Sequence, residues 1–186
     1  MTLYTLLPAV MLFSFGACIG SFLNVCIFRI PEKKSIVFPG SFCPVCKQDI
    51  PFYCNIPILS YLALRGRCKH CKNPISIRYP LVEMLTGVFP VLLFLKFGLT
   101  PSLFFWFCFV CVLIVISFID FDHQIIPDII SLPGICIFAS SAAFIPEMSI
   151  VSVLMGIFAG GGILYTIAFL YYKLKKTEGM GGGDIK

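Results

Sequence analysis

The chain alternates long apolar stretches with shorter polar ones, and five of the apolar stretches approach the length of a membrane-spanning helix. An α-helix needs about 20 residues to cross roughly 30 Å of hydrocarbon. Pro133 and Gly134 interrupt the fourth stretch, but tilt or a partner helix can absorb such a break. The pattern predicts an all-α polytopic membrane protein with about five transmembrane helices, at about Leu6–Phe28, Leu81–Leu99, Leu103–Ile119, Ile129–Ile145 and Ile150–Tyr172.

Composition supports this prediction, because 59% of the 186 residues are hydrophobic and only 12% are charged. Soluble domains are typically about 45–50% apolar and about 25% charged. The first apolar stretch has no basic segment before it and no clear small-residue cleavage site, so we interpret it as a retained span rather than a secretory signal.

The basic residues are unevenly distributed and predict an orientation. Nine of the 14 Lys and Arg residues lie between Arg29 and Arg78, and four more follow the fifth stretch. Because basic loops stay in the cytoplasm, this places the N-terminus outside. Counting spans from there brings both Asp120 and Asp184 to the cytoplasmic face.

The segment after the first span contains two C-x2-C pairs, and four thiolates form the closed tetrahedral shell that structural zinc prefers. The cytoplasm is reducing, and a loop of about fifty residues cannot build much of a core, so bound metal would supply folding free energy. Zinc is therefore favoured over a redox-active dithiol pair or unligated thiols, and His70 is interpreted as a solvated loop residue. The expected zinc ligands are Cys43, Cys46, Cys68 and Cys71.

Two acidic motifs lie at the ends of apolar stretches, and they are the candidate catalytic groups. Asp120 stands in SFIDFDHQIIPD and Asp184 in GMGGGD. Carboxylates at membrane depth are costly and are functional candidates by default. In aspartyl catalysis one carboxylate takes a proton from water while a protonated neighbour polarises the scissile carbonyl, and like charges separate their two pKa values.

These motifs together resemble the type 4 prepilin peptidases over nearly the whole chain. The resemblance lies in GSFLNV with Arg29 and Pro31, the paired C-x2-C loop, IRYPLVE from Ile77, the Asp120 motif with its proline seven residues later, and GGGD ending at Asp184. It implies a bacterial inner-membrane aspartyl endopeptidase that cleaves the leaders of type IV prepilins and type II secretion pseudopilins at the cytoplasmic face. Asp120 and Asp184 would be catalytic, and N-methylation of the new N-terminus would follow.

The same resemblance implies S-adenosylmethionine as methyl donor, but no residue can be assigned to it. It also implies further spans after Lys186, so we expect a C-terminally truncated fragment. The expected domains are a first transmembrane helix at 1–28, a cytoplasmic zinc-binding domain at 29–79 and a peptidase transmembrane domain at 80–186. Expected partners are the pilin substrates and membrane lipid, and no nucleic acid.

Two functions from other classes remain open from the residues alone. One is a non-enzymatic membrane scaffold whose zinc loop docks a partner, and the other is a membrane thiol-disulfide carrier. Two polar residues in spans are interpreted structurally: Asn24 as a hydrogen bond to a neighbouring helix, and Glu83 as a helix N-terminal cap rather than a residue lining an active cavity.

Overall fold

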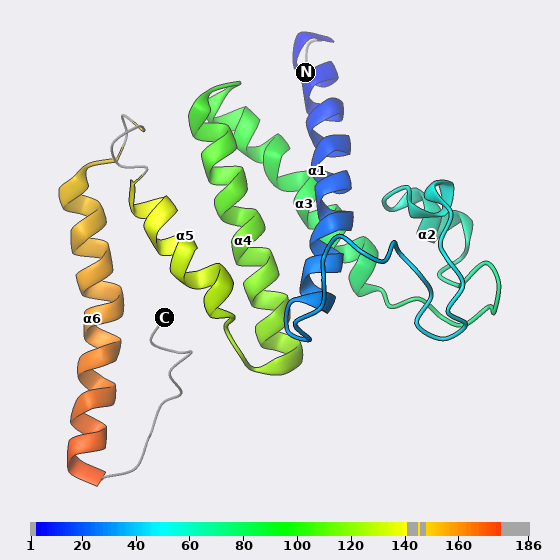
Figure 1. Cartoon of the computed structure of the whole chain (residues 1–186). Helices are drawn as coiled ribbons and strands as arrows, with labels where there is room; N and C mark the ends of the chain where they lie inside the picture. Colours follow the sequence, from blue (N-terminus) through cyan, green and yellow to red (C-terminus); the bar gives the residue numbers. More distant parts are fainter. Residues whose placement is uncertain (1–2, 141–144, 146–147, 176–186) are drawn as a thin grey trace. The chain divides into compact units, whose positions relative to one another are not determined.

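The computed structural model describes residues 3–140, 145 and 148–175. Long helices dominate this part of the chain, and its extended segments contribute only two isolated β-bridges. The expected all-α class is thus confirmed. The elements in order are α1 (Leu3–Arg29), a 3-10 turn η1 (Phe52–Asn55), α2 (Leu59–Ala63), α3 (Arg78–Phe97), α4 (Pro101–His123), α5 (Asp128–Ser140) and α6 (Ile150–Lys175), as Figure 1 shows.

Four of these helices are long and apolar enough to cross a membrane: α1, α3, α4 and α6. They match four of the five predicted spans. The fourth predicted span corresponds to α5, which is described over 13 residues and contains Pro133. Large apolar side chains stay exposed along the four long helices, as expected for surfaces that face lipid rather than water.

Helix α4 extends further than predicted. The expected third span ended at Ile119 with Asp120 just outside it, whereas α4 continues to His123 and Asp120 lies in its last turn. The residues after Ile119 include neither glycine nor proline before Pro127, so nothing in the sequence stops the helix earlier. The turn ends at Gln124, which has a φ of 53° and donates its N–H to the Asp120 carbonyl at 2.7 Å.

The chain divides into two compact units, residues 1–118 and 119–186. In the first unit, α1 and α3 make a close contact that depends on glycine. A Cβ atom on Gly16 would overlap the backbone oxygen of Thr86, and one on Gly20 would overlap the Thr86 hydroxyl group. A Cβ on Gly87 would lie 2.9 Å from the ring of Phe13. Small residues let helix backbones approach closely in lipid, where apolar burial drives little association.

Buried polar side chains extend the same contact toward the end of α1. Asn24 is 2% exposed and donates its Nδ2 to the carbonyl oxygen of Tyr79 in α3 at 3.1 Å. The predicted interhelical role of Asn24 is therefore confirmed. Thr86 is fully buried and its hydroxyl donates to the carbonyl oxygen of Val82 within α3. Each of these side chains donates a hydrogen bond to a backbone carbonyl at a buried position, where an unpaired polar group would be costly.

We expect Gly16→Ala and Gly20→Ala to destabilise the first unit, because each new methyl group meets the Thr86 region at less than van der Waals separation. Overpacking of this kind costs about 1–3 kcal/mol. Thermal unfolding of the purified protein in detergent measures the effect. Gly156→Ala in α6 is the matched control, since no described atom lies within 4 Å of its added Cβ. Equal unfolding temperatures for all three variants would contradict the role assigned to the glycines.

Candidate functional site: a four-thiol centre and a helix-end carboxylate

The four cysteines lie on two turns with the same local structure, 25 residues apart in the chain. In the first turn the N–H of Cys43 donates to the Gln48 carbonyl at 2.9 Å, and Lys47 N–H donates back to the Cys43 carbonyl at 2.9 Å. In the second turn Cys68 and Asn73 make the first bond at 2.8 Å, and Lys72 and Cys68 make the second at 3.1 Å. The two turns therefore share the same pattern of backbone hydrogen bonds.

A residue with positive φ closes each turn. Lys47 has a φ of 59° and Lys72 a φ of 61°, a region that non-glycine residues seldom adopt. One isolated β-bridge flanks each turn, Phe42 with Asp49 and Arg67 with Pro74. Each pair of thiols is thereby presented on a short, hydrogen-bonded backbone loop.

The two turns bring all four thiols together. The four sulfur atoms lie within 4.8 Å of one another, and the Sγ atoms of Cys43 and Cys71 are 3.9 Å apart. Zinc in a tetrahedral thiolate shell has bonds of ~2.3 Å, which places neighbouring sulfurs ~3.8 Å apart. The donor set and its spacing therefore fit a four-coordinate metal ion after small adjustments, and the cluster can hold one.

The thiols of the second turn differ strongly in their pKa values. The backbone N–H groups of Cys71 and His70 lower the pKa of Cys68 to about 6. For Cys71 the N–H of Asn73 acts in the lowering direction, but burial and the neighbouring thiols Cys68, Cys46 and Cys43 outweigh it and raise its pKa to about 11. Without a cation the four groups thus cannot all be ionised at neutral pH, since each thiolate opposes the next. A divalent cation would remove that penalty and release protons as it binds.

Other sulfur and imidazole groups stand apart from this cluster. His70 is exposed on the second turn and is not among the four residues that could hold a metal. Cys54 in η1 is a free, half-buried thiol. Neither the histidine nor this fifth loop cysteine is needed to complete the shell.

The loop that carries the turns is fastened to the helices by buried charged side chains. Arg29, the last residue of α1, is 7% exposed and donates to the carbonyls of Ser35 at 2.9 Å and Gly40 at 3.1 Å. Glu83 in α3 is 7% exposed, and its Oε2 accepts the N–H of Ile58 at 2.7 Å. Ile58 has a φ of 61°, a rare conformation for a β-branched residue. Such strain persists only where surrounding contacts over-determine it.

The predicted capping role of Glu83 is wrong. Helix α3 begins at Arg78 without a side-chain cap, so Glu83 lies more than one turn inside the helix. The predicted second span began at about Leu81, whereas α3 begins three residues earlier and has Pro80 in its first turn. Proline is tolerated in a first turn, where its missing N–H has no partner to lose.

Of the two candidate catalytic carboxylates, the structure describes one. Asp120 is exposed in the last turn of α4, after nineteen mostly apolar residues, and Asp128 opens α5, where its charge suits the helix N-terminus. Asp184 lies outside the described residues, as do the glycines that precede it. The pairing of the two aspartates therefore stays a prediction.

These features define a class: a multi-pass helical membrane protein with a four-thiol centre between its first two spans and an acidic helix end further along. Comparison with known families gives the identity more closely. Residues 14–97 match the Bacterial Peptidase A24 N-terminal domain, and residues 107–186 match the Type IV leader peptidase family. The chain belongs to this type IV leader peptidase family. No solved structure matches it.

Relatives support the same conclusion. The chain is 42% identical over 176 residues to a prepilin leader peptidase/N-methyltransferase of Myxococcus xanthus, covering 95% of this chain and 52% of the relative. Proteins of the same name from Neisseria gonorrhoeae and Klebsiella pneumoniae are 38% and 34% identical, with 68% and 83% of their lengths covered. The chain thus spans about half the length of the Myxococcus relative. Family membership disfavours the scaffold and thiol-carrier alternatives.

We expect the purified protein to retain about one zinc ion per chain, and Cys43→Ser to lower that content well below half, since three thiolates leave the shell open. Metal analysis after gel filtration measures both. Cys54→Ser is the matched control, because this loop thiol is outside the cluster. Equal zinc loss from Cys54→Ser, or a metal-free native protein, would count against the site.

In protein stripped of metal by a chelator, we expect Cys68 to be alkylated before Cys71. With a pKa of about 6, Cys68 is mainly thiolate at pH 7, whereas Cys71, at about 11, is still a thiol. Mass spectrometry after brief iodoacetamide treatment from pH 5 to 9 follows this. Labelling of Cys68 should rise through pH 6 and then level off. Simultaneous labelling of both residues at every pH would be the contrary result.

Proposed function

We propose that the protein is a membrane aspartyl endopeptidase that cleaves the leader peptide of type IV prepilins and pseudopilins at the cytoplasmic face. The observation that carries the proposal is the family match over residues 107–186, which includes both acidic motifs. Exposure of Asp120 at the end of an apolar helix agrees with it, since hydrolysis needs water and a membrane-anchored substrate would be cut near the membrane boundary.

Asp120 and Asp184 would act as the acid–base pair. Ionised Asp120 or Asp184 takes a proton from the attacking water, and the other, still protonated, donates a hydrogen bond to the scissile carbonyl. Two like charges close together cannot both persist in a poorly hydrated site, so a single shared proton is favoured. The exposed position of Asp120 would give that water a path from the aqueous side.

Charge distribution supports the orientation and the kind of substrate. The loop between α1 and α3, together with the helix-end residues Arg29 and Arg78, carries nine of the 14 basic residues, which favours a cytoplasmic location and an external N-terminus. A substrate that fits this geometry has an apolar segment within the membrane and a short leader in the cytoplasm. Prepilins are the substrates that the names of the relatives imply.

The segment 29–79 would be a cytoplasmic zinc domain, with zinc bound by Cys43, Cys46, Cys68 and Cys71. Its role there would be structural, because four thiolates leave no open coordination position for a substrate. Residues 80–186 would form the peptidase domain, embedded in the inner membrane.

N-methylation of the newly exposed N-terminus would be the second activity, as the names of the relatives imply. S-adenosylmethionine would supply the methyl group when bound.

Asp120→Asn in the full-length protein should reduce leader cleavage by at least about a thousandfold, because the amide can neither take nor hold the proton. A gel-shift assay of a prepilin substrate in membranes measures this. Asp122→Asn is the matched control, two residues away on the same exposed helix end, and should keep cleavage within about tenfold of the unmodified enzyme.

Substantial processing by Asp120→Asn would remove this residue from the mechanism. Loss of cleavage in Asp122→Asn with retention in Asp120→Asn would move the active carboxylate by two positions. Asp184→Asn should match Asp120→Asn, and full activity of that variant would refute the paired mechanism.

A further inference from the structure

The loop between α1 and α3 exposes large apolar side chains in two stretches, residues 36–39 and 52–62, which we call the apolar segments. Phe38 is 77% exposed and Phe52 is 87% exposed. The other strongly exposed members are Val37, Leu59 and Leu62. Scattered apolar residues are ordinary on a protein surface, but a group of them bordered by polar residues marks a contact with a membrane or another protein.

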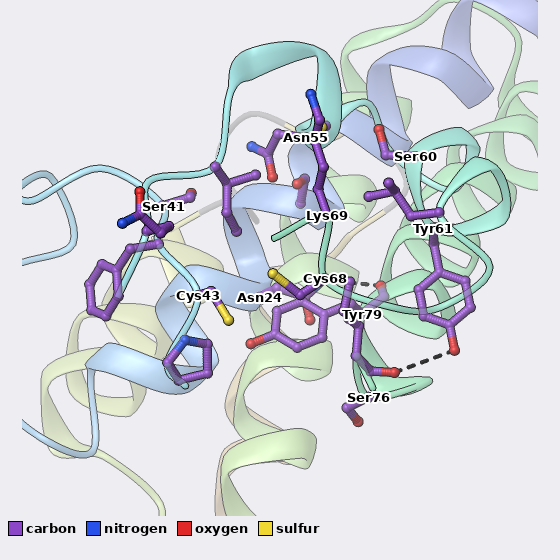
Figure 2. A pocket seen from close by; sticks show the side chains of 18 of the residues that line it. Asn24, Ser41, Cys43, Asn55, Ser60, Tyr61, Cys68, Lys69, Ser76 and Tyr79 are labelled. Carbon is purple, nitrogen blue, oxygen red and sulfur yellow. Dashed lines mark hydrogen bonds between the residues drawn. The ribbon is translucent and has the colours of Figure 1, made fainter. Parts of the chain in front are cut away.

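Helix α2, in the second apolar segment, divides its side chains between two sides. Ser60 and Tyr61 line a cavity of about 430 Å³ between the loop, the end of α1 and the start of α3, as Figure 2 shows. Leu59 and Leu62 are three residues apart and so lie on one side of the helix, outside that lining and exposed. The apolar side of α2 thus faces away from the protein, the reverse of a helix that lies on a core in water.

The start of α2 lies beside a membrane-spanning helix rather than beyond its end. The N–H of Ile58 donates to Glu83 Oε2 at 2.7 Å. Glu83 follows the first residue of α3, Arg78, by five positions, which is about 7 Å of helix. A glutamate side chain on a helix points back toward the helix start, so this contact is level with the first turns of α3. The second apolar segment therefore lies at the depth where a span leaves the lipid.

The first apolar segment lies beside α1 in the same way. Ile36, Val37 and Pro39 line a cavity of about 380 Å³. Residues of α1 from Cys18 to Arg29 line the same cavity, and this part of the helix is about 16 Å long. Two separate stretches of the loop thus flank the ends of spans, where lipid is the ordinary neighbour.

Basic side chains border both apolar segments. Lys33 precedes the first segment, and Arg65 and Arg67 follow the second, all of them exposed. From residue 29 to residue 78 there are nine basic and two acidic residues. Apolar side chains with cations beside them match the boundary between anionic lipid headgroups and acyl chains. The charge therefore favours a lipid surface over a protein partner.

Lys69 adds a cation next to the most exposed ring. Its Nζ donates to the Tyr53 hydroxyl at 2.9 Å and lies 4.8 Å from the centre of the Tyr53 ring. The Tyr53 and Phe52 rings are in edge contact, with centroids 5.6 Å apart. Tyrosine is typical of membrane interfaces, because its ring is apolar and its hydroxyl is polar.

We propose that the two apolar segments anchor the loop in the cytoplasmic leaflet. Their exposed apolar side chains enter the upper acyl-chain region, and the bordering Lys and Arg side chains contact anionic phosphates. The inference rests on the proposed topology, and it adds a lipid contact made by the loop itself. The four-thiol cluster is then held at the membrane surface rather than free in the cytoplasm.

Photo-crosslinking from lipid tests the proposal on the unmodified full-length enzyme. Nanodiscs of phosphatidylcholine and phosphatidylglycerol carry a trace of phospholipid with a diazirine near the carbonyl end of one acyl chain. Mass spectrometry after pepsin digestion should find label on residues 36–39 and 52–62 as well as on the spans. The exposed, polar second cysteine turn, residues 69–74, is the internal control and should carry at least about fivefold less label.

Labelled spans with apolar segments that carry no more label than residues 69–74 would overturn the proposal. Hydrogen exchange in the same nanodiscs gives a second answer. Apolar segments that stay unlabelled, but become protected from exchange when prepilin is added, would assign this surface to a protein partner instead.

The double variant Arg65→Gln/Arg67→Gln removes two bordering cations and keeps every apolar side chain. Label on residues 52–62 should fall by about twofold or more in nanodiscs with phosphatidylglycerol and stay unchanged in phosphatidylcholine alone. Lys47→Gln/Lys72→Gln is the matched control, since it removes two exposed cations from the cysteine turns. An equal fall in both double variants, or no fall in either lipid, would overturn the contact with anionic lipid.

Leader cleavage measured on the same nanodiscs keeps this proposal separate from the peptidase proposal. A nanodisc exposes both leaflets, so labelling does not depend on which face of the membrane the loop occupies. An enzyme that cleaves prepilin but has no lipid label on either apolar segment would lose the proposed anchor and remain a peptidase. Label on both segments in an enzyme that does not cleave prepilin would support the anchor and count against the peptidase proposal.

Discussion

The close contact of α1 with α3 is the constraint on which the first unit depends. Neither Gly16 nor Gly20 can carry a Cβ without meeting the Thr86 region, so the helix separation is determined by the absence of side chains. That separation places Asn24 within reach of the Tyr79 carbonyl. It also brings the two ends of the intervening loop, Arg29 and Arg78, onto neighbouring helices. Much of the entropy cost of closing this long loop is thereby met by helix packing.

Even with its ends fixed, the loop has very few buried side chains to stabilise its fold. Between residues 30 and 77, the buried positions are Cys43 and Gly66. So small a core cannot offset the conformational entropy of nearly fifty residues. A metal in the four-thiol cluster would supply the missing free energy, while Arg29 and Glu83 determine where the folded loop sits against the helices.

Sequence patterns predicted the helices and the cysteine cluster, but they did not predict most of the contacts between residues far apart in the chain. Apolar length located α1, α3, α4 and α6, and the C-x2-C spacing identified four thiols that do converge. The sequence also predicted that Asn24 bonds a neighbouring helix. It did not indicate that Glu83 reaches Ile58, 25 residues away in the chain, because only the fold brings them together. Nor did the sequence indicate that the Oδ1 atom of Asn24 is buried without a hydrogen-bond partner among the described residues. The pairing of Asp120 with Asp184 rests on topology and family resemblance alone.

The bonds that fasten the loop to the helices share one property. Arg29 donates to the carbonyls of Ser35 and Gly40, and Glu83 accepts the N–H of Ile58. Between the helices themselves, Asn24 of α1 likewise donates to the carbonyl of Tyr79 in α3. In every case the partner is a main-chain atom. Substitutions at Ser35, Ile58 or Tyr79 can therefore leave the attachment in place, provided that the backbone path is kept. The side chains on the loop's surface can therefore change while the few anchoring side chains on the helices stay the same.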